Sequence, residues 1–146
     1  MDIFTIVKYD KNLHDAFIHN TIYKNLKQLY KDSMQFNVFN SFANQYIDRL
    51  LENNDCLVMS SEEFPQLVYG FVIYSYHVTR PVIHSVYVKS MYRGNNLAKI
   101  LLGQVSENFS LCFYTLKFQK QTNYLKHVYE FAEYNPLILT DDRGNT

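Results

Sequence analysis

The spacing of apolar residues changes several times along this chain, and the order of the changes limits the folds it can adopt. Alternation predicts strands, and three- and four-residue spacing predicts helices. The predicted series is strand 3–8, helix 13–30 with Asn12 as its cap, helix 42–51 after Ser41, strands 56–59, 67–76 and 82–88, helix 97–109, strand 111–116, helix 123–131 and strand 137–140. This order predicts an α+β fold, with one mixed, mostly antiparallel, twisted sheet and helices on both faces.

The composition fits one domain of ordinary size. The chain has 146 residues, and no repeat or Pro/Gly/Ser-rich linker divides it, so we expect a single domain over 1–140 and a polar tail over 141–146. Its 14 Lys+Arg balance its 14 Asp+Glu, which argues against nucleic acid as a partner but leaves room for a small basic pocket.

Several other classes of protein are also disfavoured. No stretch approaches the roughly 20 apolar residues of a membrane span, and the N-terminal apolar run is too short for a signal peptide. We therefore expect a cytoplasmic protein with no membrane partner. Cys56 and Cys112 lie in apolar runs and should be buried and reduced, and no Cys or His spacing is typical of a metal site.

The most informative segment is the predicted strand-to-helix junction between Val88 and Leu97. The first turn of a helix has unpaired N–H groups and a partial positive charge, which together favour an anion. Gly94 can adopt a positive φ, and Asn is one of the few other residue types that tolerate it, as at position 96. Lys89, Arg93 and Lys99 would surround a ligand with more than one phosphate. The alternative is a surface loop with an ordinary Asn-rich cap.

This segment resembles the acyl-CoA-binding motif of the GNAT N-acetyltransferases, Gln/Arg-x-x-Gly-x-Gly/Ala followed by a Leu-rich helix. The matching residues run from Met91 to Asn96, with Gly94 retained and with Met91 and Asn96 departing from the usual residue types. The element order is also similar over most of the chain, and the small size resembles GNAT-like proteins of tailed phages. The resemblance implies acetyl-CoA as cosubstrate, contacted by Val86, Val88, Lys89, Arg93, Gly94, Asn95, Asn96, Leu97, Ala98 and Lys99.

In the family, the fourth strand separates from its neighbour and pairs with the pantetheine arm, a contact that the resemblance assigns to Val88. It also assigns the catalytic acid to Tyr129, which would protonate the leaving thiolate, with Tyr124 as the second choice. The alternative for Tyr129 is a tyrosine packed in the core, which is the usual role of a half-buried aromatic residue.

His84 is the candidate base. It precedes Val88 by four residues in the same predicted strand, which would place both side chains on one face, and an imidazole titrates near neutral pH. His77, at the end of the preceding strand, would be its neighbour. The alternative is a structural histidine with satisfied hydrogen bonds.

These observations lead to two main hypotheses. The first is an acyl-CoA-dependent N-acyltransferase, in which an unidentified amine acceptor attacks acetyl-CoA directly. The second is a catalytically silent GNAT-fold protein that acts as a protein-interaction module, suggested by the two motif departures and by 13 Tyr and 11 Phe. Single-stranded nucleic-acid binding through stacked aromatic residues is a weaker third hypothesis, and a homodimer is left open.

Overall fold

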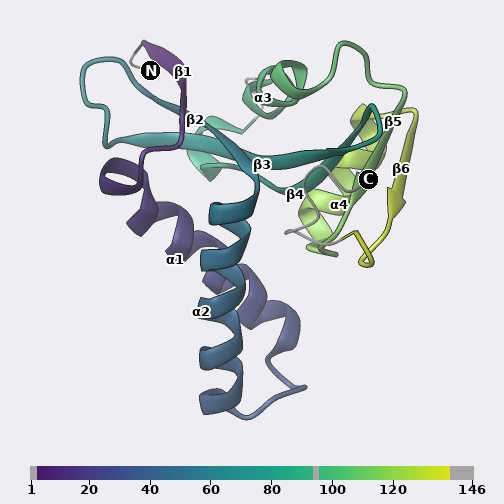
Figure 1. Ribbon diagram of the computed structural model, residues 1–146. Coiled ribbons are helices and arrows are strands. Elements are labelled where there is room, and N and C mark those ends of the chain that lie inside the picture. The colour runs from purple at the N-terminus through teal and green to yellow at the C-terminus, as the bar shows by residue number, and fades with distance from the viewer. Residues whose placement is uncertain (1–2, 94–95, 139–146) are drawn as a thin grey trace.

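A computed structural model describes residues 3–93 and 96–138 (Figure 1). Its elements are β1 (Phe4–Lys8), α1 (Lys11–Tyr30), α2 (Phe36–Asn53), β2 (Asp55–Ser61), β3 (Val68–His77), β4 (Arg80–Val88), the 3-10 turn η1 (Ser90–Tyr92), α3 (Leu97–Val105), β5 (Leu111–Tyr114), α4 (Gln119–Val128) and β6 (Phe131–Tyr134). The predicted order of strands and helices is confirmed.

The six strands form one sheet in the order β1-β2-β3-β4-β5-β6. The pairs β1–β2, β2–β3 and β3–β4 are antiparallel, whereas β4–β5 and β5–β6 are parallel. The parallel pairs follow from the helical crossovers, because α3 connects β4 to β5 and α4 connects β5 to β6. The sheet is therefore mixed and mostly antiparallel, as the sequence predicts.

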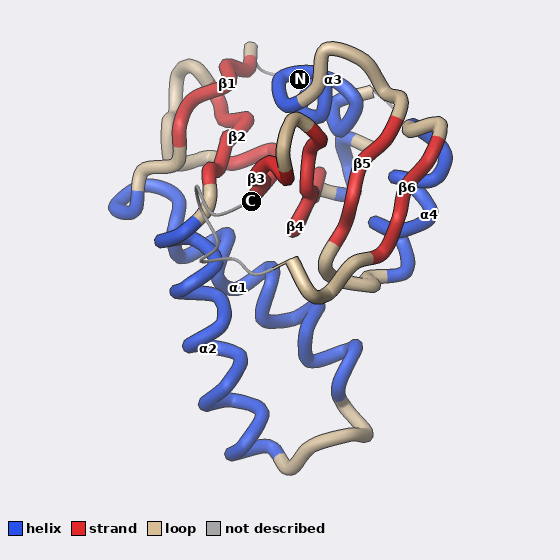
Figure 2. Tube along the Cα trace, turned by 45° about the vertical axis from the view of Figure 1, so that its right-hand side comes forward, coloured by secondary structure: helices blue, strands red, loops and turns tan. Residues whose placement is uncertain are grey.

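Helices cover both faces of the sheet, and each face has its own core. Ile22 of α1 and Ile47 of α2 pack with Phe71 of β3, whereas Leu101 of α3 packs with the next residue of the same strand, Val72. This division follows from the alternation of side chains along β3. In Figure 1, α1 and α2 extend below the sheet and α3 lies above it. The turn between α1 and α2 points away from the sheet in both views (Figure 2).

The starts of the first two helices differ from the predictions. The cap of α1 is Asp10 rather than Asn12, because the Asp10 carboxylate accepts the Asn12 backbone N–H. The second helix starts at Phe36, before the expected cap Ser41. Its added first turn buries Phe39, whose ring packs against Tyr23 of α1. This helix–helix contact is not visible in a local pattern.

Several bounds in the C-terminal half also differ from the predictions. The last helix, α4, spans Gln119–Val128 instead of 123–131, and α3 ends at Val105 instead of 109. The final strand is β6, because the Phe131 N–H donates to the Ser110 carbonyl and brings the chain alongside β5. The strand predicted over 137–140 is wrong at 137–138, which form a turn and a bend, and residues 139–140 lie outside the described residues, as does the expected tail.

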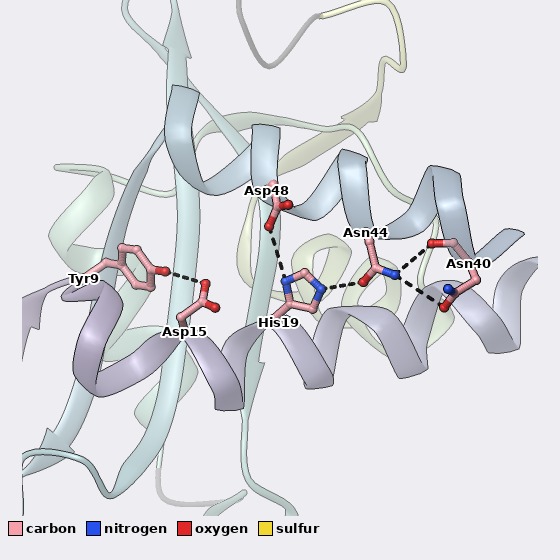
Figure 3. A network of polar contacts seen from close by, with 6 residues as sticks. All are labelled: Tyr9, Asp15, His19, Asn40, Asn44 and Asp48. Atoms are coloured by element: carbon pink, nitrogen blue, oxygen red, sulfur yellow. Dashed lines mark hydrogen bonds and ion pairs between the residues drawn. The ribbon is translucent and has the colours of Figure 1, made fainter.

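A line of polar contacts fixes α1 against its neighbours (Figure 3). The Tyr9 hydroxyl donates to Asp15 at 2.7 Å, and the His19 Nε2–H donates to the Asn44 side-chain oxygen at 2.7 Å. On the other side of the imidazole, His19 Nδ1 lies 3.7 Å from an Asp48 carboxylate oxygen. These contacts hold α1 in a defined position relative to α2, which matters because α1 also forms a wall of the cleft described below.

Both cysteines are buried and free, as predicted, and burial raises the pKa of each thiol. Within residues 3–93 and 96–138, no group of three His, Cys, Asp or Glu side chains could hold a metal ion. No helix in this part of the chain combines the length and apolarity needed to cross a membrane.

Candidate functional site

The strands β4 and β5 separate soon after they meet. They pair only at Val82–Phe113 and Ile83–Tyr114, and residues 84–88 of β4 continue without a β5 partner. The separation coincides with an irregularity in β4, where Ser85 pairs with Ile73 and Ile83 pairs with Tyr74, so that His84 is an extra residue. An extra residue bends and twists a strand locally. We attribute the separation of the two strands to this bulge.

A cleft of about 790 Å³ lies beside the free edge of β4. One wall is β4 itself, and the others come from the start of α3, the start of α4 and the second half of α1. The lining residues are Asn25, Gln28, Leu29, Val86, Tyr87, Val88, Arg93, Asn96, Leu97, Ala98, Lys117, Phe118, Gln119, Lys120, Gln121 and Tyr124.

The first turn of α3 opens into this cleft. Asn96 has φ of 60° and ψ of 20°, as expected for a residue type that tolerates the left-handed region, and its side chain makes no capping hydrogen bond. The first intrahelical bond runs from the Ile100 N–H to the Asn96 carbonyl. The backbone N–H groups of Leu97, Ala98 and Lys99 therefore have no acceptor within the helix and are available to a ligand. The helix dipole favours an anionic ligand there.

The charged side chains of the cleft are all positive. Arg93, Lys117 and Lys120 line it, and its described lining includes no Asp, Glu or His. The Arg93 Nε–H donates to the Val88 carbonyl at 2.8 Å, which fixes the guanidinium at the end of β4. Three cations around one cavity in a chain of zero net charge produce a local field that suits a polyanion.

No protein-family model matches the sequence, and no curated protein matches it. Solved structures do match its fold. One is assigned to the GNAT family of acetyltransferases, from Staphylococcus aureus, with 17% identity, a TM-score of 0.53 and coverage of 70% of this chain and 88% of that one. The fold is the GNAT fold. Another match, assigned as an acetyltransferase from Pyrococcus furiosus, has 14% identity and a TM-score of 0.50 and covers 91% of this chain and 82% of that one.

A further GNAT family acetyltransferase, from Staphylococcus aureus Mu50, matches with 13% identity and a TM-score of 0.46 over 70% of this chain. The chain spans 64% of the length of that protein. The matches with TM-scores of 0.53 and 0.50 establish the GNAT fold alone, and the activity is treated below as a proposal.

Most residues expected at the cofactor site do line the GNAT-fold cleft. They are Val86, Val88, Arg93, Asn96, Leu97 and Ala98. Gly94 and Asn95 lie outside the described residues. Lys89 and Lys99 do not line the cleft: the Lys89 ammonium lies 5.0 Å from the centre of the Phe17 ring, and that of Lys99 lies 5.6 Å from the centre of the Phe109 ring.

His84 does not share a face with Val88, because the bulge interrupts the alternation. Its Nε2 lies 3.0 Å from the Ser75 hydroxyl, and its Nδ1 lies 2.8 Å from the Thr115 hydroxyl. The imidazole is fully buried, and burial lowers its pKa to about 4. A neutral, enclosed imidazole with both nitrogens occupied connects β3 and β4 to Thr115, the residue after β5, and does not line the cleft. This geometry matches the structural alternative, and His77 does not line the cleft either.

Tyr129 is also placed away from the cleft. It follows α4, is 2% exposed, and its hydroxyl lies 2.7 Å from that of Ser106, just after α3. Its ring packs edge-on against Phe109. Tyr124, on the helix itself, does line the GNAT-fold cleft, as does Tyr87 of β4. Of the two sequence candidates, the structure thus brings only Tyr124 to the free edge of β4.

Some residues that shape the cleft have no clear signal in the sequence. A side chain at Gly70 would place its Cβ 2.6 Å from the Tyr87 carbonyl oxygen, so the glycine allows β3 to approach β4 closely. The Gln121 side chain bonds to β4 from α4. Lys117 and Lys120 form a basic cluster with Lys126 in the sequence, which fits a solvated face or a surface for an acidic partner, but their spacing does not assign them to a cavity.

A second hollow, of about 860 Å³, lies between α4 and the strands β5 and β6. Lys117 borders both cavities, and its ammonium lies 4.3 Å from the centre of the Tyr134 ring. This hollow has no lining residue from β4 or α3. It therefore lacks both the free strand edge and the helix N-terminus that make the first cleft suitable for an extended anionic ligand.

Proposed function

We propose that the protein is an acyl-CoA-dependent N-acyltransferase that moves an acetyl group from acetyl-CoA to an amine by direct attack. The observation that supports this most is the combination in one cleft of a free strand edge, a helix N-terminus and three cations. These features fit an extended ligand with amides at one end and phosphates at the other. The GNAT fold is consistent with this proposal.

The residues of the cleft divide into two groups by their chemistry. Arg93, Lys117 and Lys120, together with the first turn of α3, would hold the phosphates. The peptide groups of Val86 and Val88 would pair with the pantetheine arm. Acetyl-CoA, when bound, supplies an acyl group activated as a thioester.

Tyr124 is our candidate acid. It is half-buried, and burial raises the pKa of its phenol, so the hydroxyl keeps its proton at neutral pH and can donate it to a leaving thiolate. The described lining of the cleft provides no carboxylate or imidazole that could act as a base. In our proposal the acceptor amine therefore loses its proton to solvent.

Thermal unfolding with added CoA tests the proposal. A ligand at 100 times its dissociation constant stabilises the native state by about 2.7 kcal/mol. For a chain of this length we expect the Tm to rise by about 5–10 °C. Arg93→Ala and Lys120→Ala should reduce the rise, whereas Lys99→Ala, whose ammonium lies outside the cleft, should retain it. An unchanged Tm at millimolar CoA would contradict the proposal.

Tyr124→Phe should lower turnover by about 100-fold while CoA affinity is kept, because it removes the proton donor and leaves the ring. The measurement is thiol release from acetyl-CoA in the presence of spermidine, an aminoglycoside and a lysine peptide. Tyr129→Phe is the matched control: it should leave turnover unchanged and reduce stability by about 1 kcal/mol, since its hydroxyl bonds to Ser106. Reduced turnover in Tyr129→Phe alone would reassign the acid.

A second candidate function is a protein-interaction module with the GNAT fold. It is supported by large apolar side chains that remain exposed around the turn between α1 and α2, among them Phe36 and Phe42, each 61% exposed. This candidate is favoured if CoA has no effect on the Tm and gel filtration shows a complex that the Phe36→Ser and Phe42→Ser changes dissociate.

A further inference from the structure

The side chain of Gln121 occupies the gap where β4 and the end of β5 separate. Its Oε1 accepts the Val86 backbone N–H at 2.9 Å, and its Nε2 donates to the Leu116 carbonyl at 3.4 Å. The residue is 7% exposed although it belongs to the first turn of α4 and lines the cleft. One carboxamide thus bridges the two segments that diverge.

The Gln121 carboxamide lies where a neighbouring strand would place a peptide group against β4. The Lys89 N–H donates to the Tyr69 carbonyl, toward β3, so the alternation of an antiparallel strand turns the peptide groups of Val86 and Val88 toward the cleft. Beyond Ile83, β5 no longer pairs with this edge. A buried N–H needs a partner, and a carboxamide offers the same donor and acceptor as a peptide group.

We propose that Gln121 is a specificity-determining residue whose carboxamide holds the place of a ligand amide on β4. A ligand that lies extended along this edge and presents a secondary amide displaces Gln121 from Val86 and restores the lost hydrogen bond. A ligand without an amide at this point breaks the same bond and gains no replacement. The inference rests on the proposed function, in which the amide-bearing ligand is the pantetheine arm of CoA.

Gln121 is well placed for such an exchange. Its two contacts on either side of the gap are single hydrogen bonds to main-chain atoms, and the cleft beside it has room for a displaced side chain. Gln104 of α3 is exposed and does not line the cleft, so it offers a comparison residue of the same type.

Calorimetric titration with two probes tests the inference. The probes are CoA, and adenosine 3′,5′-bisphosphate, which has phosphates but no pantetheine arm. Gln121→Ala should bind CoA about three- to tenfold more tightly than the wild type, because the competing hydrogen bond is gone. Its affinity for the bisphosphate should be unchanged. Gln121→Met keeps the length and volume of the side chain without the amide, so it should also bind CoA more tightly and leave the affinity for the bisphosphate unchanged.

The controls separate this inference from the proposed function. Gln104→Ala should have wild-type affinity for both probes, and the Tm of each variant without ligand confirms that it folds. CoA binding by the wild type, with equal or weaker binding by both Gln121 variants, would overturn the inference alone. Absence of CoA binding by the wild type and both variants would overturn the proposed function, and this inference with it.

Discussion

Gly70→Ala should unfold at a lower temperature than the wild type and should bind CoA poorly. The added Cβ would lie 2.6 Å from the Tyr87 carbonyl oxygen and 3.2 Å from the Val88 Cγ2. The first contact is with backbone, so β4 must move. We expect a loss of about 2–3 kcal/mol in the free energy of unfolding, or about 5–10 °C in Tm. Affinity should fall as well, because the displaced residues line the cleft.

Gly103→Ala is the matched control for this change. Gly103 is exposed in α3, and no heavy atom lies within 4 Å of a Cβ added there. Alanine in a helix interior is favoured over glycine by about 0.5–1 kcal/mol, so this variant should be slightly more stable and bind CoA as the wild type does. Equal stability and affinity of Gly70→Ala and the wild type would show that β3 and β4 are less closely packed than described.

The second large effect is the pH dependence of stability caused by His84. Burial lowers the pKa of this imidazole from 6.5 to about 4, so between these values the unfolded chain binds a proton that the folded chain excludes. The stabilisation is fully present above pH 6.5 and is lost as the pH falls toward 4. The expected loss is about 3 kcal/mol, measured by urea unfolding at pH 7, 5.5 and 4.5.

His84→Gln should remove most of this pH dependence, although it reduces stability at pH 7. Ser75→Ala is the companion variant, because it deletes one hydroxyl partner and keeps the imidazole buried, so the loss at acidic pH should remain. If the wild type and His84→Gln lose stability in parallel between pH 6.5 and 4, the buried imidazole is not the group responsible.

The order of elements could be predicted because it depends on local periodicity. The buried residues of α1 recur every four residues and those of α2 every three or four, and β2 to β4 are rich in β-branched and aromatic residues. The conformation of Asn96 was also predictable, since few residue types tolerate a positive φ. The same local reasoning placed Arg93 at the cleft.

The placement of the other charged and titratable residues could not be predicted, because it depends on long-range contacts. Lys89 and Lys99 are close to Arg93 in sequence but do not line the cleft, whereas Lys117, in the β5–α4 connection, and Lys120, in the first turn of α4, do. The face of His84 depends on a one-residue slip against β3. In a strand that is apolar on both sides, the sequence contains no signal of that slip.

The extra residue of β4 also has a consequence for how such a cleft can arise. Without His84, the strand could keep its regular ladder with β3 and continue beside β5 beyond Ile83, and the slot for a ligand would close. In this geometry, one extra residue makes the difference between a strand paired along both edges and a strand that forms the wall of the cleft. For homologous chains, the length of this strand should therefore be a better indicator of a ligand slot than the identity of the residue at its centre.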